Sequence, residues 1–369
     1  MDGPKSLSQT RICFVAPKAY PLFDPRVEEV FGGAEVDVYF LATELAKDPG
    51  LKVTMIVADY GQGPVQVLEG VRILRGLSYE QSSVGAAISL WKAFGRAEGQ
   101  VYFIKTPSPG VPLLALFCKR RHKAFVYRTS SSPQYDRAFR RSHRLLGRAF
   151  DWALRRAAVV FAQSAEAAEA LEQDVGLRKV QVIANGHRLA PLGDCPRDII
   201  LWVGRSDRMK RPELFLGLAA KFPDQQFVMI CQQATADEDY PGLVECAGAI
   251  PNLRFIERVP FSEVQAWFRR AKVFVNTSDS EGFPNTFIQA AQAGVPIVSL
   301  NSDPDHFLVQ HQCGVFAAGS FDRLAEGLRS LLEGDRYLEA GLRARRYVEQ
   351  THDVARIVET YKQVLRSLI

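Results

Sequence analysis

The chain has 369 residues, of which 47% are hydrophobic and 24% charged, a composition that excludes fibrous and intrinsically disordered proteins. Because one hydrophobic core rarely grows past about 250–300 residues, we expect two domains. The six cysteines are scattered and include no Cys-x-x-Cys pair. We therefore expect reduced thiols and a cytoplasmic protein.

No secretory or membrane-spanning segment is predicted. The first residues, Met-Asp-Gly-Pro-Lys-Ser, contain no apolar stretch, and the longest strongly apolar run covers only residues 111–118. A bilayer span needs roughly 20 residues. The net charge of +5 is unevenly placed, since residues 92–158 hold 15 Lys and Arg against three acids. This asymmetry predicts an anionic partner for one face of the first domain.

The first half of the chain alternates short apolar runs with helical patterns, which predicts a doubly wound α/β domain. Continuous apolar runs, typical of buried parallel strands, cover residues 11–16, 52–58, 101–104, 124–127, 159–162 and 180–184. Helical spacing covers residues 34–47, 137–156 and 165–174.

The second half repeats the alternation. Strands are predicted over residues 199–203, 226–231, 253–256, 272–276 and 295–299, with helices over 212–221, 262–270 and 286–293. The chain is mostly helical after residue 318 and ends in an amphipathic pattern over 354–368. Residues 185–197 have linker composition. We therefore predict domains over residues 1–190 and 191–350, followed by a terminal helix in 351–369.

The predicted helix over residues 137–156 opens with Arg137, ends with Arg156 and is strongly basic. Apolar residues such as Leu145 and Trp152 interleave its arginines, as in helices that lie on anionic membranes. This interpretation would place a cytoplasmic protein at the inner face of a membrane. The alternative is a helix packed on its sheet with a solvated basic face. No nucleic-acid partner is expected, because neither a groove-reading motif nor a stacking platform is present.

Two loops carry most of the functional information. The first follows the predicted strand 199–203 and reads Gly204-Arg205-Ser-Asp-Arg-Met-Lys210. Ligands collect at the carboxyl ends of strands in such sheets. Gly204 lets the backbone approach a ligand, and Arg205 and Lys210 can converge on a diphosphate.

The second loop follows the predicted strand 272–276 and reads Ser-Asp-Ser-Glu281-Gly282-Phe-Pro-Asn285-Thr286. Gly282 frees the backbone, and Asn285 or Thr286 begins a helix whose unpaired N–H groups suit phosphate and sugar hydroxyls. Glu281 would accept hydrogen bonds from hydroxyls. Gln289, about one turn into the helix, could face the same ligand.

Together the two loops resemble the C-terminal domain of retaining GT-B glycosyltransferases of family 4. The hallmarks of that family are a Gly-Arg…Lys loop and a Glu-Gly-Phe segment with a second Glu eight positions after the first. The resemblance continues upstream through residues 31–35 (Phe-Gly-Gly-Ala-Glu), 161–164 and 183–186 in the right order, and so covers nearly the whole chain. It implies two Rossmann-like domains facing a central cleft, with the acceptor bound by the first and the nucleotide sugar by the second. The terminal helix would cross back onto the first domain.

The resemblance further implies retaining transfer of a hexosyl unit from a UDP- or GDP-type donor to a saccharide or lipid-linked acceptor, in surface polysaccharide or glycolipid synthesis. Arg205 and Lys210 would hold the donor diphosphate, and Glu281 would contact the sugar hydroxyls. The other donor-binding residues would be Gly32, Gly33, Gly204, Gly282, Phe283, Asn285, Thr286 and Gln289. No cofactor and no metal are expected, because two cations can offset the charge of the leaving diphosphate. The Asp-x-Asp tripeptides at 237–239 and 303–305 are interpreted as solvated loops.

The chain departs from the family pattern at Gln289, which stands where a second Glu contacting the ribose is expected. A neutral amide accepts a weaker hydrogen bond than a carboxylate does. The histidine often found in the first domain is absent near residues 127–131, and Arg128 and the serines could line that position. Two alternatives stay open: a nucleotide-sugar epimerase, and a catalytically silent GT-B subunit that scaffolds a partner, which Gln289 favours.

Overall fold

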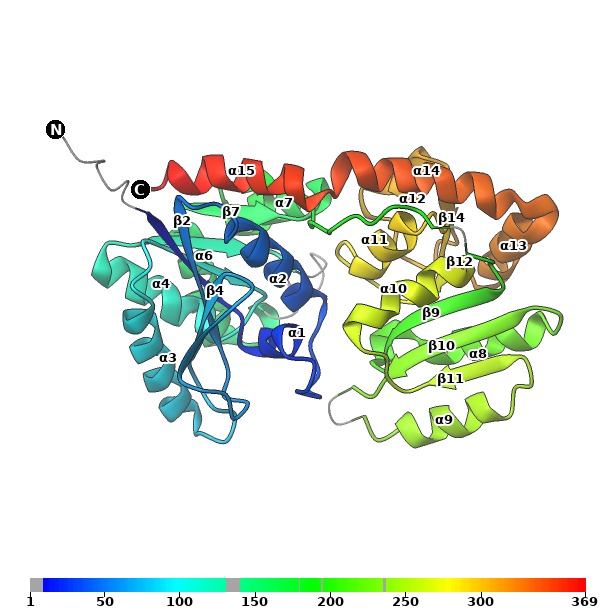
Figure 1. The fold of residues 1–369 in the computed structure, drawn as a ribbon, viewed down its shortest axis with the longest axis horizontal. Helices are drawn as coiled ribbons and strands as arrows, with labels where there is room; N and C mark the ends of the chain where they lie inside the picture. The colour runs from blue at the N-terminus through cyan, green and yellow to red at the C-terminus, as the bar shows by residue number, and fades with distance from the viewer. Residues whose placement is uncertain (1–8, 131–139, 179, 194, 235–236) are drawn as a thin grey trace. The chain divides into compact units, whose positions relative to one another are not determined.

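The computed structural model describes residues 9–130, 140–178, 180–193, 195–234 and 237–369. The chain divides into two compact units. The first comprises Met1–Arg188 together with Asp353–Ile369, and the second comprises Leu189–His352. Each unit is built around one largely parallel sheet with helices packed on it (Figure 1).

The first unit contains an eight-stranded sheet in the order β3-β4-β2-β1-β5-β6-β7-β8, parallel except for the β3–β4 pair. Its strands are β1 (Thr10–Val15), β2 (Leu51–Val57), β3 (Val65–Leu68), β4 (Val71–Arg75), β5 (Val101–Lys105), β6 (Ala124–Arg128), β7 (Val159–Ala162) and β8 (Val180–Val182). Its helices are η1 (Pro17–Ala19), α1 (Tyr20–Phe23), α2 (Gly33–Leu45), α3 (Ser83–Ala97), α4 (Gly110–Arg121), α6 (Arg144–Arg155), α7 (Ala165–Val175) and α15 (Val354–Arg366).

Helices cover both faces of this sheet, as the continuous apolar strands predict. Alternate residues of β1 enter different cores: Cys13 packs with residues of α3, α4 and α6, whereas Phe14 packs with residues of α2 and α15. The last helix of the chain, α15, therefore belongs to the first unit, where Tyr361 is buried against Phe103 and Phe161.

A buried ionic network ties α15 to α2. Arg128, at the end of β6, is fully buried and donates to Asp37 Oδ2 at 2.8 Å, to Asn185 Oδ1 at 2.8 Å and to the Tyr361 hydroxyl. Lys105 Nζ donates to the same Asp37 oxygen at 2.7 Å. Burial alone would raise the pKa of Asp37, but the charges of Arg128 and Lys105 outweigh it and lower the pKa to about 2. Arg128 is thus committed to this network and not exposed to a ligand.

The second unit contains a six-stranded parallel sheet in the order β11-β10-β9-β12-β13-β14. Its strands are β9 (Ile199–Arg205), β10 (Gln226–Gln232), β11 (Leu253–Ile256), β12 (Ala271–Asn276), β13 (Ile297–Ser299) and β14 (Gly314–Phe316). Its helices are η2 (Arg208–Lys210), α8 (Pro212–Lys221), α9 (Tyr240–Gly248), α10 (Phe261–Arg270), α11 (Asn285–Gln292), η3 (Pro304–His306), α12 (Phe307–Gln310), α13 (Phe321–Leu332), η4 (Glu333–Asp335) and α14 (Arg336–Thr351).

The predicted two-domain α/β architecture with parallel sheets is confirmed, and the eleven strands predicted from apolar runs are all present. The β3–β4 hairpin and helices α3, α4 and α9 were not predicted. β3 alternates exposed and half-buried residues at the sheet edge, so it lacks the continuous apolar run of a buried strand. Of the basic helix predicted over 137–156, α6 accounts for Arg144–Arg155, and residues 137–139 lie outside the described residues.

Candidate functional site

The two loops singled out in the sequence lie side by side, because β9 and β12 are adjacent parallel strands of the second unit. Their carboxyl ends therefore meet at one edge of the sheet, where ligands of such folds bind. The loop backbones are also joined directly, since the Asp279 N–H donates to the Met209 carbonyl at 2.9 Å.

Lys210 and Glu281 form the centre of this site. Lys210 ends the short helix η2, and its Nζ forms an ion pair with Glu281 Oε1. Both side chains are largely but not fully buried, with 26% and 13% of their surface exposed. The fold thus brings together an ammonium and a carboxylate that are 71 positions apart in sequence, and leaves both within reach of a ligand.

A chain of buried polar side chains orients Glu281. Ser278 Oγ donates to Glu281 Oε1 at 2.7 Å and itself accepts from Asn276 Nδ2 at 3.1 Å. Asn276 Oδ1 in turn accepts from Ser299 Oγ on the neighbouring strand β13 at 3.3 Å. Because a satisfied network of this kind holds its members in one arrangement, the Glu281 carboxylate is positioned in advance.

Thr277 fixes the other partner of the pair. Its hydroxyl donates to the Lys210 carbonyl at 2.6 Å and accepts from the indole nitrogen of Trp202 at 2.9 Å. Thr277 is fully buried and Trp202 is 2% exposed. The hydroxyl therefore anchors the loop that carries Lys210 to the core of the second unit.

Replacing Thr277 by valine is expected to lower the free energy of unfolding by about 1–3 kcal/mol, because the buried Trp202 N–H loses its acceptor. Urea denaturation of the full chain measures the change. Thr277→Ser keeps the hydroxyl and is the matched control. A valine variant as stable as the wild type would show that these two hydrogen bonds do not hold the loop.

Arg205 ends β9, and within the described residues it forms no ion pair with Glu281. Its Nη2 lies 2.9 Å from Asp207 Oδ2, two residues further along the same loop, and its side chain is 40% exposed. Gly204, just before it, packs under the Trp202 ring, which an added Cβ would approach to 2.7 Å. Any larger residue at Gly204 would therefore displace the ring that Thr277 holds.

The predicted helix start is found at α11, whose first two residues are Asn285 and Thr286. Pro284, the residue before this start, has no side chain that could cap it, and the positive end of the helix dipole lies here. Phe283 is 6% exposed and its ring lies 4.5 Å from the His352 ring and 5.2 Å from the Phe307 ring, centroid to centroid. Its side chain thus anchors the loop, and only the backbone is left to face a ligand.

Gln289 lies on α11 and is 7% exposed. Within the described part of the chain its side chain makes no hydrogen bond to Lys210 or Glu281, so the structure does not join it to the central pair. Its backbone carbonyl accepts from Gln265 Nε2 at 3.2 Å. Gly282, by contrast, directly follows Glu281 in the loop and is half-buried.

Gly32 and Gly33 belong to the first unit. Gly32 precedes α2 and Gly33 is its first residue. The Gly32 N–H donates to Glu35 Oε2 at 2.9 Å, and a Cβ added to Gly32 would lie 3.1 Å from that oxygen. Glycine at this position therefore leaves room for the carboxylate to fold back over the helix start.

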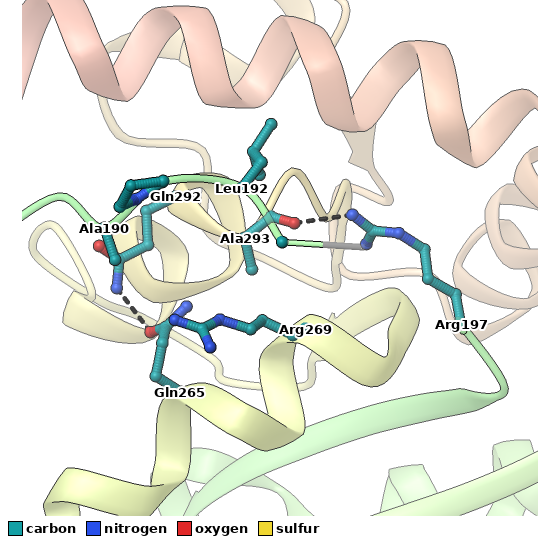
Figure 2. Close-up of a pocket in the computed structure, with 9 residues that line it drawn as sticks. Ala190, Leu192, Arg197, Gln265, Arg269, Gln292 and Ala293 are labelled. Carbon is teal, nitrogen blue, oxygen red and sulfur yellow. Dashed lines mark hydrogen bonds between the residues drawn. The ribbon is translucent and has the colours of Figure 1, made fainter. Parts of the chain in front are cut away.

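A small cavity in the second unit lies at the other edge of the sheet, where β9 and β12 begin. Figure 2 shows Arg197 reaching the Ala293 carbonyl, at 2.7 Å, and Gln292 bonded to Gln265. The cavity measures about 10 Å³, which is room for roughly one water molecule. It is too small for a nucleotide and is not part of the site.

The sequence predicted roles for Arg205, Lys210 and Glu281 but did not point to the residues that hold Lys210 and Glu281 in place. Asn276 ends the buried strand β12, and Thr277 and Ser278 follow it directly, which is the signal that could have marked them. Asp207 was within the loop but was given no role. Within the described residues, no group of three or more His, Cys, Asp or Glu side chains is arranged to hold a metal ion.

Solved structures with the same fold extend over the whole chain. Sucrose-phosphate synthase from Thermosynechococcus elongatus has a TM-score of 0.81 and 18% identity, covering 98% of this chain and 99% of that one. A trehalose-6-phosphate protein from E. coli, bound with UDP-2-fluoro glucose, has a TM-score of 0.72 at 12% identity, covering 98% and 100%. WaaG, a glycosyltransferase involved in lipopolysaccharide biosynthesis, has a TM-score of 0.69 at 14% identity, covering 96% and 99%. The chain therefore has the GT-B fold.

Family models match both halves of the chain. Residues 31–190 match the model of Glycosyltransferase Family 4, and residues 194–351 match the model of Glycosyl transferases group 1. An uncharacterized glycosyltransferase of Haemophilus influenzae (strain ATCC 51907 / DSM 11121 / KW20 / Rd) is 26% identical over 194 residues, which are 50% of this chain and 54% of the relative. The match thus spans about half of that relative's length. The chain therefore combines the GT-B fold with segments that match the Glycosyltransferase Family 4 and Glycosyl transferases group 1 models.

Proposed function

We propose that the protein transfers a sugar from a nucleoside diphosphate donor of UDP or GDP type to a saccharide or lipid-linked acceptor, with retention of the anomeric configuration. The observation that carries the proposal is the Lys210–Glu281 ion pair at the carboxyl ends of β9 and β12, next in sequence to the start of α11. The E. coli structure named above supports it, since a UDP-sugar analogue is bound to that protein.

In the proposed reaction, Lys210 and Arg205 stabilise the negative charge that grows on the leaving diphosphate. Both residues lie at the strand ends. The hydrogen bond from Thr277 to the Lys210 carbonyl holds the backbone of the loop that carries Lys210. The N–H groups of Asn285 and Thr286 add the positive end of the α11 dipole. Two cations and a helix terminus can carry this charge without a metal ion.

Glu281 contacts hydroxyls of the donor sugar in this proposal. Its Oε1 accepts from Ser278 and pairs with Lys210, which leaves Oε2 to accept from the ligand. In a retaining transfer the acceptor hydroxyl attacks on the face that the diphosphate leaves, and its proton passes to a leaving diphosphate oxygen. Glu281 then orients the sugar and does not act as the base.

Incubation of the purified protein with UDP-, GDP- and ADP-sugars, each with and without saccharide and glycolipid acceptors, tests the proposal. We expect nucleotide release that depends on an acceptor, and NMR of the product should show the anomeric configuration of the donor. An inverted product would contradict retention. Conversion of the sugar nucleotide without acceptor would indicate an epimerase, and no turnover with any donor would favour a silent scaffold.

We also propose that one face of the first unit contacts anionic lipid. Helix α4 packs between α3 and α6, and the outer surface of these helices exposes Val84, Ile88 and Leu145, which are 71%, 51% and 82% exposed. The same three helices carry exposed basic residues: Lys92 and Arg96 on α3, Lys119, Arg120 and Arg121 on α4, and Arg144 and Arg148 on α6. Exposed apolar residues within a basic surface are typical of peripheral membrane contact. Within the described residues, no helix is long and apolar enough to cross a bilayer.

The double variant Arg144→Glu/Arg148→Glu is expected to reduce co-sedimentation with vesicles containing anionic phospholipid by about tenfold or more, because each basic residue near such a surface contributes roughly 1 kcal/mol. Binding of the wild type should fall with added salt. Arg336→Glu/Arg346→Glu on α14 changes the net charge equally and is the control. Equal binding of the two variants would argue against this face.

A further inference from the structure

Arg205 forms an ion pair with Asp207, and binding of a diphosphate by Arg205 does not explain why an acidic residue lies beside it. Arg205 Nη2 lies 2.9 Å from Asp207 Oδ2, so the proposed phosphate ligand already has an anion beside it. That oxygen is shielded from solvent and accepts no hydrogen bond in the part of the chain that the structure describes. The charge of Arg205 therefore compensates the shielded oxygen of a carboxylate whose side chain is 34% exposed.

The backbone keeps Asp207 in this place. The preceding residue, Ser206, donates its N–H to the Gln232 carbonyl at 3.0 Å, and its Oγ accepts from the Ala234 N–H at 2.9 Å. The carbonyl of Asp207 accepts from the Lys210 N–H at 2.8 Å. With both sides of the residue hydrogen-bonded, a bound diphosphate cannot carry the Asp207 backbone away from Arg205.

We propose that Asp207 is an internal counter-ion that competes with the nucleoside diphosphate for Arg205 and so speeds release of that product. The inference rests on the proposed function. A free nucleoside diphosphate carries about three negative charges near pH 7.5, since its terminal phosphate has a second pKa near 6. Its sugar conjugate carries about two. Repulsion from Asp207 therefore acts more strongly on the product than on the donor, and Asp207 is a specificity-determining residue between them.

Titration calorimetry of the full chain with UDP, GDP and ADP and their glucose conjugates tests the proposal. Asp207→Asn keeps the size of the side chain and removes its charge. We expect the preferred nucleoside diphosphate to bind about fivefold more tightly, the size of effect seen for a half-exposed charge pair, and the donor conjugate about twofold more tightly. Product inhibition of turnover should increase in the same proportion.

Asp239→Asn is the matched control, because it removes the same charge from an exposed pair with Arg208 nearby. In an Arg205→Ala background the effect of Asp207→Asn on nucleotide binding should be smaller, because the cation for which Asp207 and the diphosphate compete is absent. Unchanged or weaker product binding by Asp207→Asn, with Arg205→Ala still weakening it, would overturn the counter-ion role and leave the proposed function standing. No nucleotide binding by the wild type would overturn both.

Discussion

Lys210→Ala is expected to lower kcat/KM for sugar transfer by about 100- to 1000-fold, the cost of removing one preorganised group that stabilises charge in the transition state. The substitution removes the ammonium from the leaving diphosphate and also leaves Glu281 without its ion-pair partner. Both losses act on groups that the proposed reaction uses, so the effect should appear chiefly in kcat.

The neighbouring Arg211→Ala is the control for this prediction. Arg211 lies on the same loop, but it pairs at the surface with Glu213 and Asp279 and is 38% exposed. We expect its activity to stay within about threefold of the wild type, because exposed pairs contribute little. A thermal melt should show that Lys210→Ala remains folded. Activity of Lys210→Ala close to that of Arg211→Ala would contradict the role given to Lys210.

Asp37→Asn is expected to lower the free energy of unfolding of the first unit by about 3–5 kcal/mol. The carboxylate compensates both Arg128 and Lys105, whose side chains are 0% and 3% exposed, and an amide would leave two buried cations without an anion. Burial already lowers the pKa of Lys105 to about 8, against the opposing pull of Asp37. Urea denaturation, with hydrogen exchange of α15 amides, measures the loss.

Glu359→Gln provides the control, because Glu359 pairs with Lys362 on α15 but is 63% exposed. Its effect should stay below about 1 kcal/mol. Equal stability of the two variants would contradict a supporting role for the buried network.

The same carboxylate predicts a pH dependence. The pKa of Asp37 is about 2 in the folded chain against an ordinary value of 3.8, so the folded state binds the proton less readily than the unfolded state. Its contribution is therefore present above about pH 4 and is lost as the pH falls towards 2. Asp37→Asn lacks the group, and its stability should fall less steeply than that of the wild type over this window.

The sequence allowed the fold to be predicted where the signal is local. Parallel strands buried on both faces are continuous apolar runs, and loops such as 204–212 follow them directly. β3 was missed because it lies half-exposed at the sheet edge, and β4 because Arg72 and Arg75 interrupt its apolar run. Pro112 near the start of α4 obscures the helical pattern of that segment.

The candidate site was predictable only in part. Arg205, Lys210 and Glu281 were predicted from a resemblance in residue spacing. The Lys210–Glu281 contact follows from the adjacency of β9 and β12, which spacing does not encode. The hydrogen bonds of Thr277 depend on a tryptophan 75 positions away. The hydrogen bond between Arg128 and Asp37 likewise joins segments that are distant in sequence. The sequence therefore suggested that Arg128 lines a ligand site and did not indicate that it lies in the core.

The central claim is that the second unit binds a nucleoside diphosphate through Arg205 and Lys210. A thermal-shift screen of the full chain against UDP, GDP, ADP and their sugar conjugates tests it most directly, because a ligand at 100 times its Kd stabilises by about 2.7 kcal/mol. We expect a shift with one nucleotide and its conjugates, and we expect that shift to be lost in the Arg205→Ala/Lys210→Ala variant. No shift with any of them at millimolar concentration, or an equal shift in the variant, would contradict it.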